Sequence, residues 1–423
     1  MSSVLPFDII AHIIDIVGEN KGTDLLKELS LVSYSFLQIC SKHLFATIEL
    51  HDAVPMCHVA SSKKGFVKLL ESRPDVVKHI RKLTYKMGFD SPTNFDNDDH
   101  VLSPILPNLL RTIPRLNCLK ITASRVLIWN LLDSSLKSAF LHLMHLPTTN
   151  HIDLSYIHNF TLSILTPSVN LHRLDLSYME CEDDDDTPEI DQSEMMMMVI
   201  PKIREFHISE CSLLTTRLLR SKRQDGRSAF DFTDLRRLSI SFSHVEDERN
   251  LRYFLQNAKL LEKLHLSVGV GRTRRLAELH DIFLLSPSAS RTLKVLDLTV
   301  PLVCGDFVSL PLAGLCEELE AMTGHNMLEA LSFEIRVDGH ETEDYIGSII
   351  QRVEKELVKP GWSALRQVSF KVLIACCLVS KENIAKLFQA LQYLPDKYLS
   401  YLSKLDSVAF NYSVCAVECA FPF

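Results

Sequence analysis

Residues 116–121 read Leu116-Asn117-Cys118-Leu119-Lys120-Ile121, an apolar-x-x-apolar-x-apolar phrase. The phrase recurs along most of the chain, in clear and in looser copies. The clear copies are Leu171-Leu174-Leu176, Leu235-Leu238-Ile240, Leu261-Leu264-Leu266 and Leu293-Leu296-Leu298. The looser copies are Ile80-Leu83-Tyr85, Ile203-Phe206-Ile208, Leu328-Leu331-Phe333, Leu365-Val368-Phe370 and Leu405-Val408-Phe410, with Ile152-Leu154 as a weak further copy. A phrase that returns about every 32 residues indicates a solenoid of stacked repeats.

The segments between the phrases have the pattern of helices. Glu246–Ala258 and Thr342–Leu357 are the best examples, since both begin with acidic residues and carry one apolar face. Strands joined by crossover helices form parallel sheets, and their apolar residues pack on those helices. We therefore expect an α/β solenoid over 80–423, with parallel strands on a concave face and helices on a convex face.

Residues that alternate with the apolar positions point to the opposite, concave side of each strand. The middle column of such residues reads Lys120, Asp153, Asp175, His207, Ser239, His265 and Asp297. The last column reads Thr122, Ser155, Ser177, Ser209, Ser241, Ser267 and Thr299. The mixed charges of the middle column suit a polar protein surface. Two interpretations of the hydroxyl column stay open: a ladder that closes the strand ends, or a strip that binds a ligand.

Residues 1–50 form a separate unit of three short helices. Pro6 suits the first turn of a helix and Gly18 a stop, while Thr23 and Ser33 can cap the second and third helices. The apolar stripe of the first helix comprises Ile9, Ile10, Ile13, Ile14 and Val17. Helices this short bury little apolar area alone, so the unit needs a neighbour or a partner. Residues 51–79 are expected to form a helical linker or cap, with a helix from Lys63 to Arg73.

Composition excludes several classes of protein. Hydrophobic residues make up 46% and charged residues 23%, typical of a globular chain. The net charge of −8 comes from residues 180–194, which hold nine acidic and no basic residues and are expected to form an acidic, solvated loop. Without them the chain is at +1, which argues against nucleic-acid binding. No apolar run reaches about 18 residues, so no membrane span is expected. Eleven scattered cysteines indicate reduced thiols in the cytoplasm or nucleus.

No catalytic motif or phosphate-binding loop is present, and 13 glycines are too few for Gly-rich ligand loops. His142 and His145 can share a helix face as metal ligands, but ordinary histidines are the favoured interpretation. The basic residues Arg217, Arg220, Lys222, Arg223 and Arg227 fit a solvated helix end better than a phosphate site. We expect neither an enzyme nor a cofactor or metal.

The N-terminal unit resembles an F-box. The residues that carry the resemblance are Leu5-Pro6-Phe7-Asp8-Ile9-Ile10, Leu25-Leu26-Lys27-Glu28-Leu29-Ser30-Leu31-Val32-Ser33, Phe36 and Leu44-Phe45. Residues 35–45 are also similar to F-box-like proteins of mushroom-forming fungi. The strand phrases resemble leucine-rich repeats, although the asparagine ladder of that family is missing.

The resemblance implies a substrate-recognition subunit of an SCF-type cullin–RING ubiquitin ligase. It implies that a Skp-type adaptor is bound by Leu5, Pro6, Ile9, Ile10, Ile13, Leu29, Val32 and Phe36. The repeats are then expected to hold an unknown target protein through Lys120, Asp153, Asp175, His207, Ser209, Ser239, Ser241, His265 and Asp297. The alternatives are a non-catalytic repeat scaffold whose N-terminal helices cap the first repeat, and an enzyme or nucleic-acid-binding protein that uses the basic cluster.

Overall fold

The computed structural model describes residues 7–20, 22–51, 63–88, 105–180, 200–222, 227–242, 244–268, 287–302, 313–324, 326–337, 343–375, 381–405 and 407–417. The chain forms two compact units. Unit 1 comprises residues 1–201 and 222–230, and unit 2 comprises residues 202–221 and 231–423. In the described ranges, no helix combines the length and the apolar character that crossing a membrane requires.

Unit 1 opens with the helices α1 (Phe7–Glu19), α2 (Thr23–Ser30) and α3 (Tyr34–Leu44). Its described strands are β1 (Thr47–His51), β2 (Lys82–Met87), β3 (Cys118–Ile128), β4 (His151–His158) and β5 (Arg173–Ser177). The helical segments between them are α4 (Lys63–Ser72), η1 (Pro74–His79), α6 (Ile105–Arg111), η2 (Trp129–Leu131), α7 (Ser134–Met144) and η3 (Leu162–Leu165).

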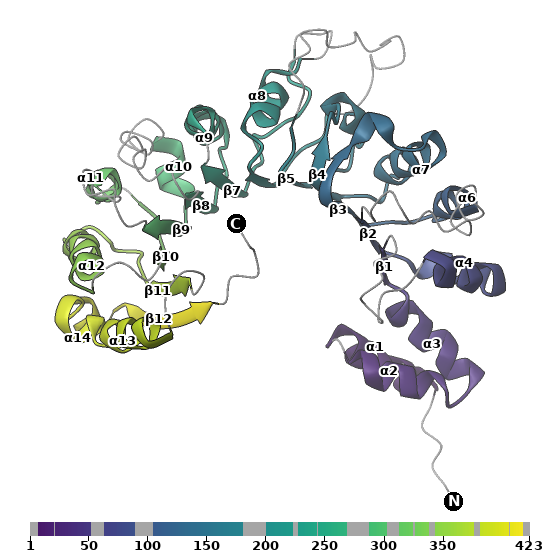
Figure 1. Cartoon of the computed structure of the whole chain (residues 1–423), viewed down its shortest axis with the longest axis horizontal. Coiled ribbons are helices and arrows are strands. Elements are labelled where there is room, and N and C mark those ends of the chain that lie inside the picture. The colour runs from purple at the N-terminus through teal and green to yellow at the C-terminus, as the bar shows by residue number, and fades with distance from the viewer. Residues whose placement is uncertain are drawn as a thin grey trace, which may run out of the picture. The chain divides into compact units, whose positions relative to one another are not determined.

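The strands of unit 1 pair in chain order, and every pair is parallel. Leu83 of β2 is in register with Leu119 of β3, and Leu119 with Ile152 of β4, so the phrase positions align from strand to strand. These side chains are buried beneath the helices, and Tyr85 of β2 meets Phe140 of α7 edge to face at 5.1 Å. Helices α4, α6 and α7 lie together on one side of the strands (Figure 1).

Unit 2 repeats this arrangement. Its described strands are β6 (Glu205–Ser209), β7 (Arg237–Phe242), β8 (Lys263–Val268), β9 (Val295–Leu302), β10 (Ala330–Val337), β11 (Gln367–Ala375) and β12 (Ala409–Val417). Its described helices are α8 (Ser212–Arg220), α9 (Val245–Asn257), α10 (Pro287–Thr292), α11 (Ala313–Met322), α12 (Glu343–Leu357), α13 (Lys381–Gln392), α14 (Leu394–Tyr398) and η6 (Leu402–Lys404).

The strands of unit 2 are also parallel and follow chain order. Phe206 of β6 packs against Phe254 of α9 with ring centroids 5.4 Å apart, which ties the strand layer to the helix layer. Phe333 and Phe370 stack at 4.8 Å on neighbouring strands. Each unit is therefore an α/β structure with parallel strands, as the sequence predicts. The apolar phrases form its core except for the last one, Leu405-Val408-Phe410, in which Leu405 is exposed and Val408 and Phe410 are only partly buried.

The predicted helices are confirmed within a few residues at α4, α9 and α12. Ser33 caps α3, because its Oγ accepts a hydrogen bond from the Phe36 N–H at 3.3 Å. Thr23 is the first residue of α2 instead of its cap, a position that Gly22 takes. Gly18 lies inside α1, which continues to Glu19, so Gly18 does not end that helix.

The sheet begins earlier than expected. Strand β1 lies where the sequence analysis placed the end of the helical unit, and Ile48 and Leu50 are in register with Leu83 and Tyr85. Phe45, Ile48 and Leu50 in fact form a further copy of the phrase. The last phrase is shifted by two residues, because Phe410, and not Val408, is in register with Val368.

Candidate protein-binding surfaces

The three N-terminal helices share a small core. Ile14 of α1, Leu26 of α2 and Cys40 of α3 are fully buried. The partly buried side chains packed around them are Ile10, Val17, Leu29, Phe36, Ile39 and Leu44. Ile10, Leu29 and Phe36 therefore belong to the edge of this core, and their partial burial contributes to the stability of the helical unit.

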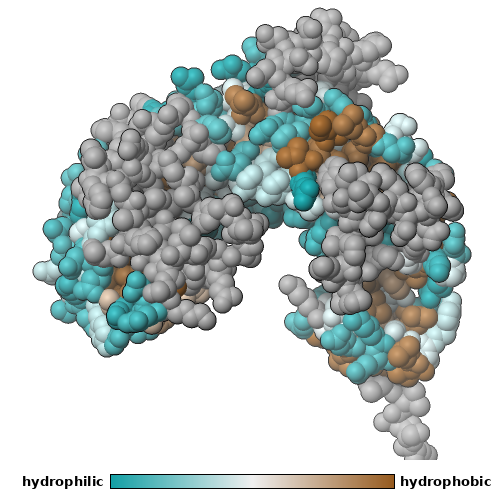
Figure 2. Space-filling view, viewed as in Figure 1, coloured by the Kyte–Doolittle hydropathy of each residue, from teal (hydrophilic) through white to brown (hydrophobic). Residues whose placement is uncertain are grey.

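A second set of apolar side chains on these helices faces solvent. Its large members are Phe7, Ile9, Ile13, Ile16, Leu25, Leu31, Val32 and Tyr34. We call this set the apolar helical surface. Leu31 and Val32, between α2 and α3, are 86% and 66% exposed. Figure 2 shows hydrophobic residues beside hydrophilic ones on this part of the chain. Exposed apolar patches that polar residues surround commonly mark interaction sites. Of the residues named for adaptor binding, Ile9, Ile13 and Val32 are exposed, whereas Ile10 packs against the core and Leu5 and Pro6 lie outside the described residues.

A cluster of ion pairs joins α1 to α3. The Asp15 carboxylate lies 2.6 Å from Lys42 Nζ and 2.7 Å from His43 Nε2. The hydrogen bond from Lys42, followed by that from His43, lowers the pKa of Asp15. The Asp15 carboxylate of α1 therefore holds α3 through two neighbouring residues, Lys42 and His43.

The strands of unit 1 present the predicted columns on the face opposite the helices, which we call polar face 1. Lys120, Asp153 and Asp175 are register partners on β3, β4 and β5, and so are Thr122, Ser155 and Ser177. A further column precedes them, made of Lys82, Cys118, His151 and Arg173. Neighbouring members of a column lie about 4.8 Å apart, as adjacent strands do.

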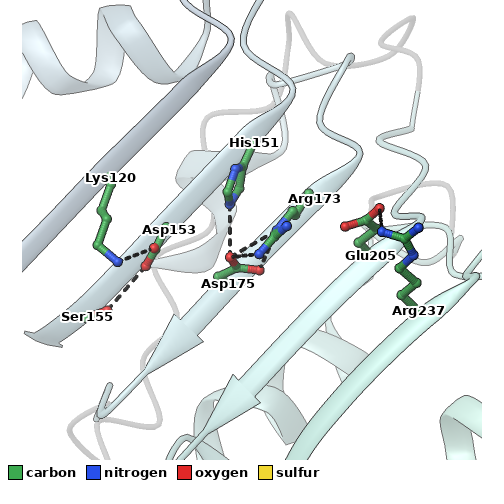
Figure 3. A network of polar contacts seen from close by, with 8 residues as sticks. All are labelled: Lys120, His151, Asp153, Ser155, Arg173, Asp175, Glu205 and Arg237. Carbon is green, nitrogen blue, oxygen red and sulfur yellow. Dashed lines mark hydrogen bonds and ion pairs between the residues drawn. The ribbon is translucent and has the colours of Figure 1, made fainter. Parts of the chain in front are cut away.

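Charged side chains of polar face 1 form pairs both between neighbouring strands and within β5 (Figure 3). Lys120 Nζ lies 2.6 Å from Asp153 Oδ2. His151 Nε2 lies 2.9 Å from Asp175 Oδ2, and Arg173 donates to the same carboxylate at 2.9 Å. The mixed signs that the sequence shows are thus neutralised locally, and a partner meets ion pairs instead of isolated charges.

Burial alone would raise the pKa of Asp175, but the hydrogen bonds from His151 and Arg173 outweigh that effect and lower it. Burial also acts to lower the pKa of His151, yet the interactions with Asp175 and Cys118 raise it from 6.5 to about 9. The protonated imidazole and the ionised carboxylate therefore stabilise each other near neutral pH.

Two tyrosines lie side by side, Tyr156 within β4 and Tyr178 directly after β5. Tyr156 and Tyr178 stack with ring centroids 4.5 Å apart and planes within 5° of parallel. Both residues have left-handed backbone conformations, with φ of 60° and 52°. Such values are unusual for bulky residues and concentrate at functional sites. Tyr178 is 44% exposed, so the stacked pair offers an aromatic surface at the edge of polar face 1.

The strands of unit 2 carry the corresponding polar face 2. His207, Ser239, His265 and Asp297 are register partners on β6 to β9, and Ser241, Ser267 and Thr299 on β7 to β9. Arg237 pairs with Glu205 at 3.1 Å (Figure 3). Lys263 pairs with Asp297 at 2.6 Å. Desolvation by burial lowers the pKa of His265, which favours its neutral form.

The hydroxyl column is not uniform. Ser155 and Thr299 are buried, which favours a structural role at those two positions. Ser209, Ser241 and Ser267 are partly exposed and remain candidates for contact with a ligand. The column ends at β10 and β11, where Glu334 and Lys371 occupy the next register positions and form an ion pair at 3.1 Å.

Several residues of these surfaces were missed by the sequence analysis. His151, Arg173, Glu205 and Arg237 belong to the first column, one position before the phrase's second apolar residue. The signal was present in the sequence, because each of these residues directly precedes a buried apolar residue of the phrase: Ile152, Leu174, Phe206 or Leu238.

The metal interpretation of His142 and His145 gains no support. His145 Nε2 lies 2.7 Å from the Ile164 carbonyl oxygen, which occupies one of its ring nitrogens. Across the described ranges, no three His, Cys, Asp or Glu side chains gather as a ligand set.

No protein-family model and no curated protein matches this sequence.

Proposed function

We propose that this protein is a substrate receptor of an SCF-type ubiquitin ligase, with an F-box-like helical unit and leucine-rich-repeat-like strands. The helical unit binds a Skp-type adaptor through the apolar helical surface, and the polar faces hold the target protein. The chain itself performs no covalent step in this role. It raises the effective concentration of the target beside the ubiquitin-conjugating enzyme.

The observation that carries the proposal is the division of the N-terminal apolar residues into two sets. Ile14, Leu26 and Cys40 form a core, while Ile9, Ile13 and Val32 are exposed on the helices above it. If the unit served only as an end cap of the repeats, selection for solubility would favour polar residues at these exposed positions. Burying a few such side chains against a partner contributes several kcal/mol at about 25 cal/mol per Å2.

The polar faces support the second half of the proposal. Paired charges, partly exposed hydroxyls and the Tyr156–Tyr178 stack offer hydrogen bonds together with an aromatic anchor. Protein interfaces combine such anchors with a polar rim. The same features would suit a non-catalytic scaffold, so binding of the adaptor is what distinguishes the two functions.

The test is co-purification with a Skp-type adaptor. An Ile9→Glu, Val32→Glu double variant changes two exposed positions and leaves the buried core intact. We expect its recovery of the adaptor to fall at least about tenfold, since charges replace apolar contacts worth more than about 1.4 kcal/mol.

Leu213→Glu is the matched control, because Leu213 is an exposed apolar residue on α8 in unit 2. It should recover the adaptor as the wild type does. Equal recovery by wild type and double variant would assign adaptor binding elsewhere, and failure of the wild type to recover any adaptor would favour the scaffold.

A further inference from the structure

Strand β12 forms an open edge of the sheet of unit 2 (Figure 1). It pairs with β11 over all nine of its residues, and in the described part of the chain no strand pairs with its other side. The N–H of Ala409 donates at 2.7 Å to the carbonyl oxygen of Arg366, the residue before β11. Alternate residues of a strand direct their N–H and C=O groups to opposite sides, so Phe410, Tyr412 and Val414 direct theirs to the open edge.

The apolar core is incomplete at this edge. Three core side chains of β11 are at most 1% exposed: Val368, Phe370 and Val372. Their register partners on β12 are only partly buried, and these are Phe410, Tyr412 and Val414. Helices α13 and α14 precede β12, and within the described residues no helix follows it. A further strand with apolar residues on its helix side would bury these side chains more completely.

Strand β12 lacks the features that usually prevent pairing between edge strands. Charged side chains, prolines, bulges and short length protect most such edges. Residues 409–417 contain no charged residue and no proline, and their register with β11 runs without a shift. The open edge of β12 is therefore suited to pairing with another strand.

We propose that two copies of this chain associate through their β12 strands, which pair antiparallel about a twofold axis at Ser413. Each copy supplies the other with outward N–H and C=O groups and with apolar side chains on the helix side of the sheet. Tyr412 then lies opposite Val414 of the second copy, so that the two half-buried sets cover each other. No charged side chains oppose each other, because β12 carries none.

A head-to-tail contact between β12 and the β1 strand of another copy fits less well. Strand β1 has five residues against nine in β12, and it carries Glu49, which pairs with Lys86. A head-to-tail contact would also leave an open edge on every assembly and build polymers, whereas the pairing of two β12 strands closes. The expected assembly is a dimer.

Analytical ultracentrifugation of the full-length protein over a range of micromolar concentrations measures this association. We expect the wild type to show an equilibrium between monomer and dimer. Val414→Pro removes an N–H that faces the open edge and leaves the bonds to β11 in place, so it should raise the dissociation constant of the dimer at least about tenfold. Circular dichroism of the variant shows whether it is folded.

Charged variants of Ser413 test the pairing without a change in the core, because Ser413 is exposed. Ser413→Lys and Ser413→Glu should each weaken the dimer at least about tenfold at low salt, since like charges then face each other at the axis. An equimolar mixture of the two variants should dimerise again, because opposite charges meet. Ser348→Lys, at an exposed serine of α12, is the matched control and should dimerise as the wild type does.

A wild type that stays monomeric at every concentration overturns the proposal. A dimer that Val414→Pro and both Ser413 variants leave unchanged also overturns it, and so does an assembly that grows beyond a dimer. If Val414→Pro fails to fold, the Ser413 variants and their mixture decide the outcome. Adaptor and target are absent from these measurements, so their result is independent of the receptor function proposed above.

Discussion

The backbone of Gly18 in α1 lies directly against the imidazole ring of His43 in α3, so that a β-carbon at position 18 would overlap the ring. The ring cannot simply move aside, because its Nε2 atom lies 2.7 Å from Asp15 on the same helix as Gly18. The close approach of α1 and α3 thus requires glycine at this position.

Gly18→Ala should therefore destabilise the helical unit by about 1–3 kcal/mol, the usual cost of overpacking, although alanine favours helices. Hydrogen exchange at the amides of α1 and α3 measures the effect locally. A Gly18→Ala, His43→Ala double variant should recover part of the loss, because the smaller side chain removes the overlap. Slower exchange in Gly18→Ala than in the wild type would contradict the packing described.

The His151–Asp175 pair predicts a pH dependence of unit 1. The pKa of His151 is raised from 6.5 to about 9, so its contribution is complete below about pH 6.5 and is lost as the pH rises through about 9. The pKa of Asp175 is lowered, so its contribution is present above 3.8 and is lost as the pH falls through its folded value.

His151→Gln should remove about 1–3 kcal/mol of the stability measured near pH 6.5 and little of that measured near pH 10. Guanidinium unfolding followed by circular dichroism at the two pH values provides the comparison. Equal destabilisation at both values would mean that packing, and not charge, accounts for the role of His151.

Glu354 on α12 holds the chain that leads to η6. Its buried carboxylate accepts hydrogen bonds from the backbone N–H groups of Tyr401, at 2.9 Å, and Leu402, at 3.0 Å. Glu354→Gln removes the charge that strengthens both bonds and should destabilise unit 2 by about 1–3 kcal/mol. The matched control is Glu382→Gln, which breaks an exposed pair with Lys386 and should cost no more than about 0.5 kcal/mol. Similar midpoints for the two variants in guanidinium unfolding would refute this role.

A substitution at Tyr178 should weaken target binding without changing the stability of the fold. Tyr178→Gly removes the exposed ring but also relieves the left-handed backbone, so we expect the free energy of unfolding to change by less than about 1 kcal/mol. Recovery of proteins that bind the repeat region should fall about tenfold or more, as for an aromatic anchor. Tyr393→Ala, at an exposed tyrosine of unit 2, is the control for loss of a ring alone. Unchanged recovery with Tyr178→Gly would remove the tyrosine pair from the target-binding surface.

The period of the phrase was enough to predict parallel strands, buried leucines and the register of the polar columns. Leu83, Leu119 and Ile152 align because each strand must place its apolar side chains under the helices, and a slip by one residue would expose all of them. A two-residue slip keeps the same side buried, which explains why the register of β12 could not be read from Val408 and Phe410 alone.

The side-chain pairs within the polar faces could not be predicted from the sequence. Periodicity identifies which residues share a face, but the pairing of Asp175 with His151 and Arg173 depends on side-chain conformations between neighbouring strands. The left-handed conformation of Tyr156 and Tyr178 was equally hidden, because tyrosine gives no sign of positive φ as glycine does.

Hydrogen exchange of the full-length protein with and without a purified Skp-type adaptor tests the receptor function most directly. The account predicts slower exchange in α1 and around Leu31 and Val32 when the adaptor is present, with no change in α12 of unit 2. Identical exchange at α1–α3 with and without a saturating concentration of adaptor would contradict it.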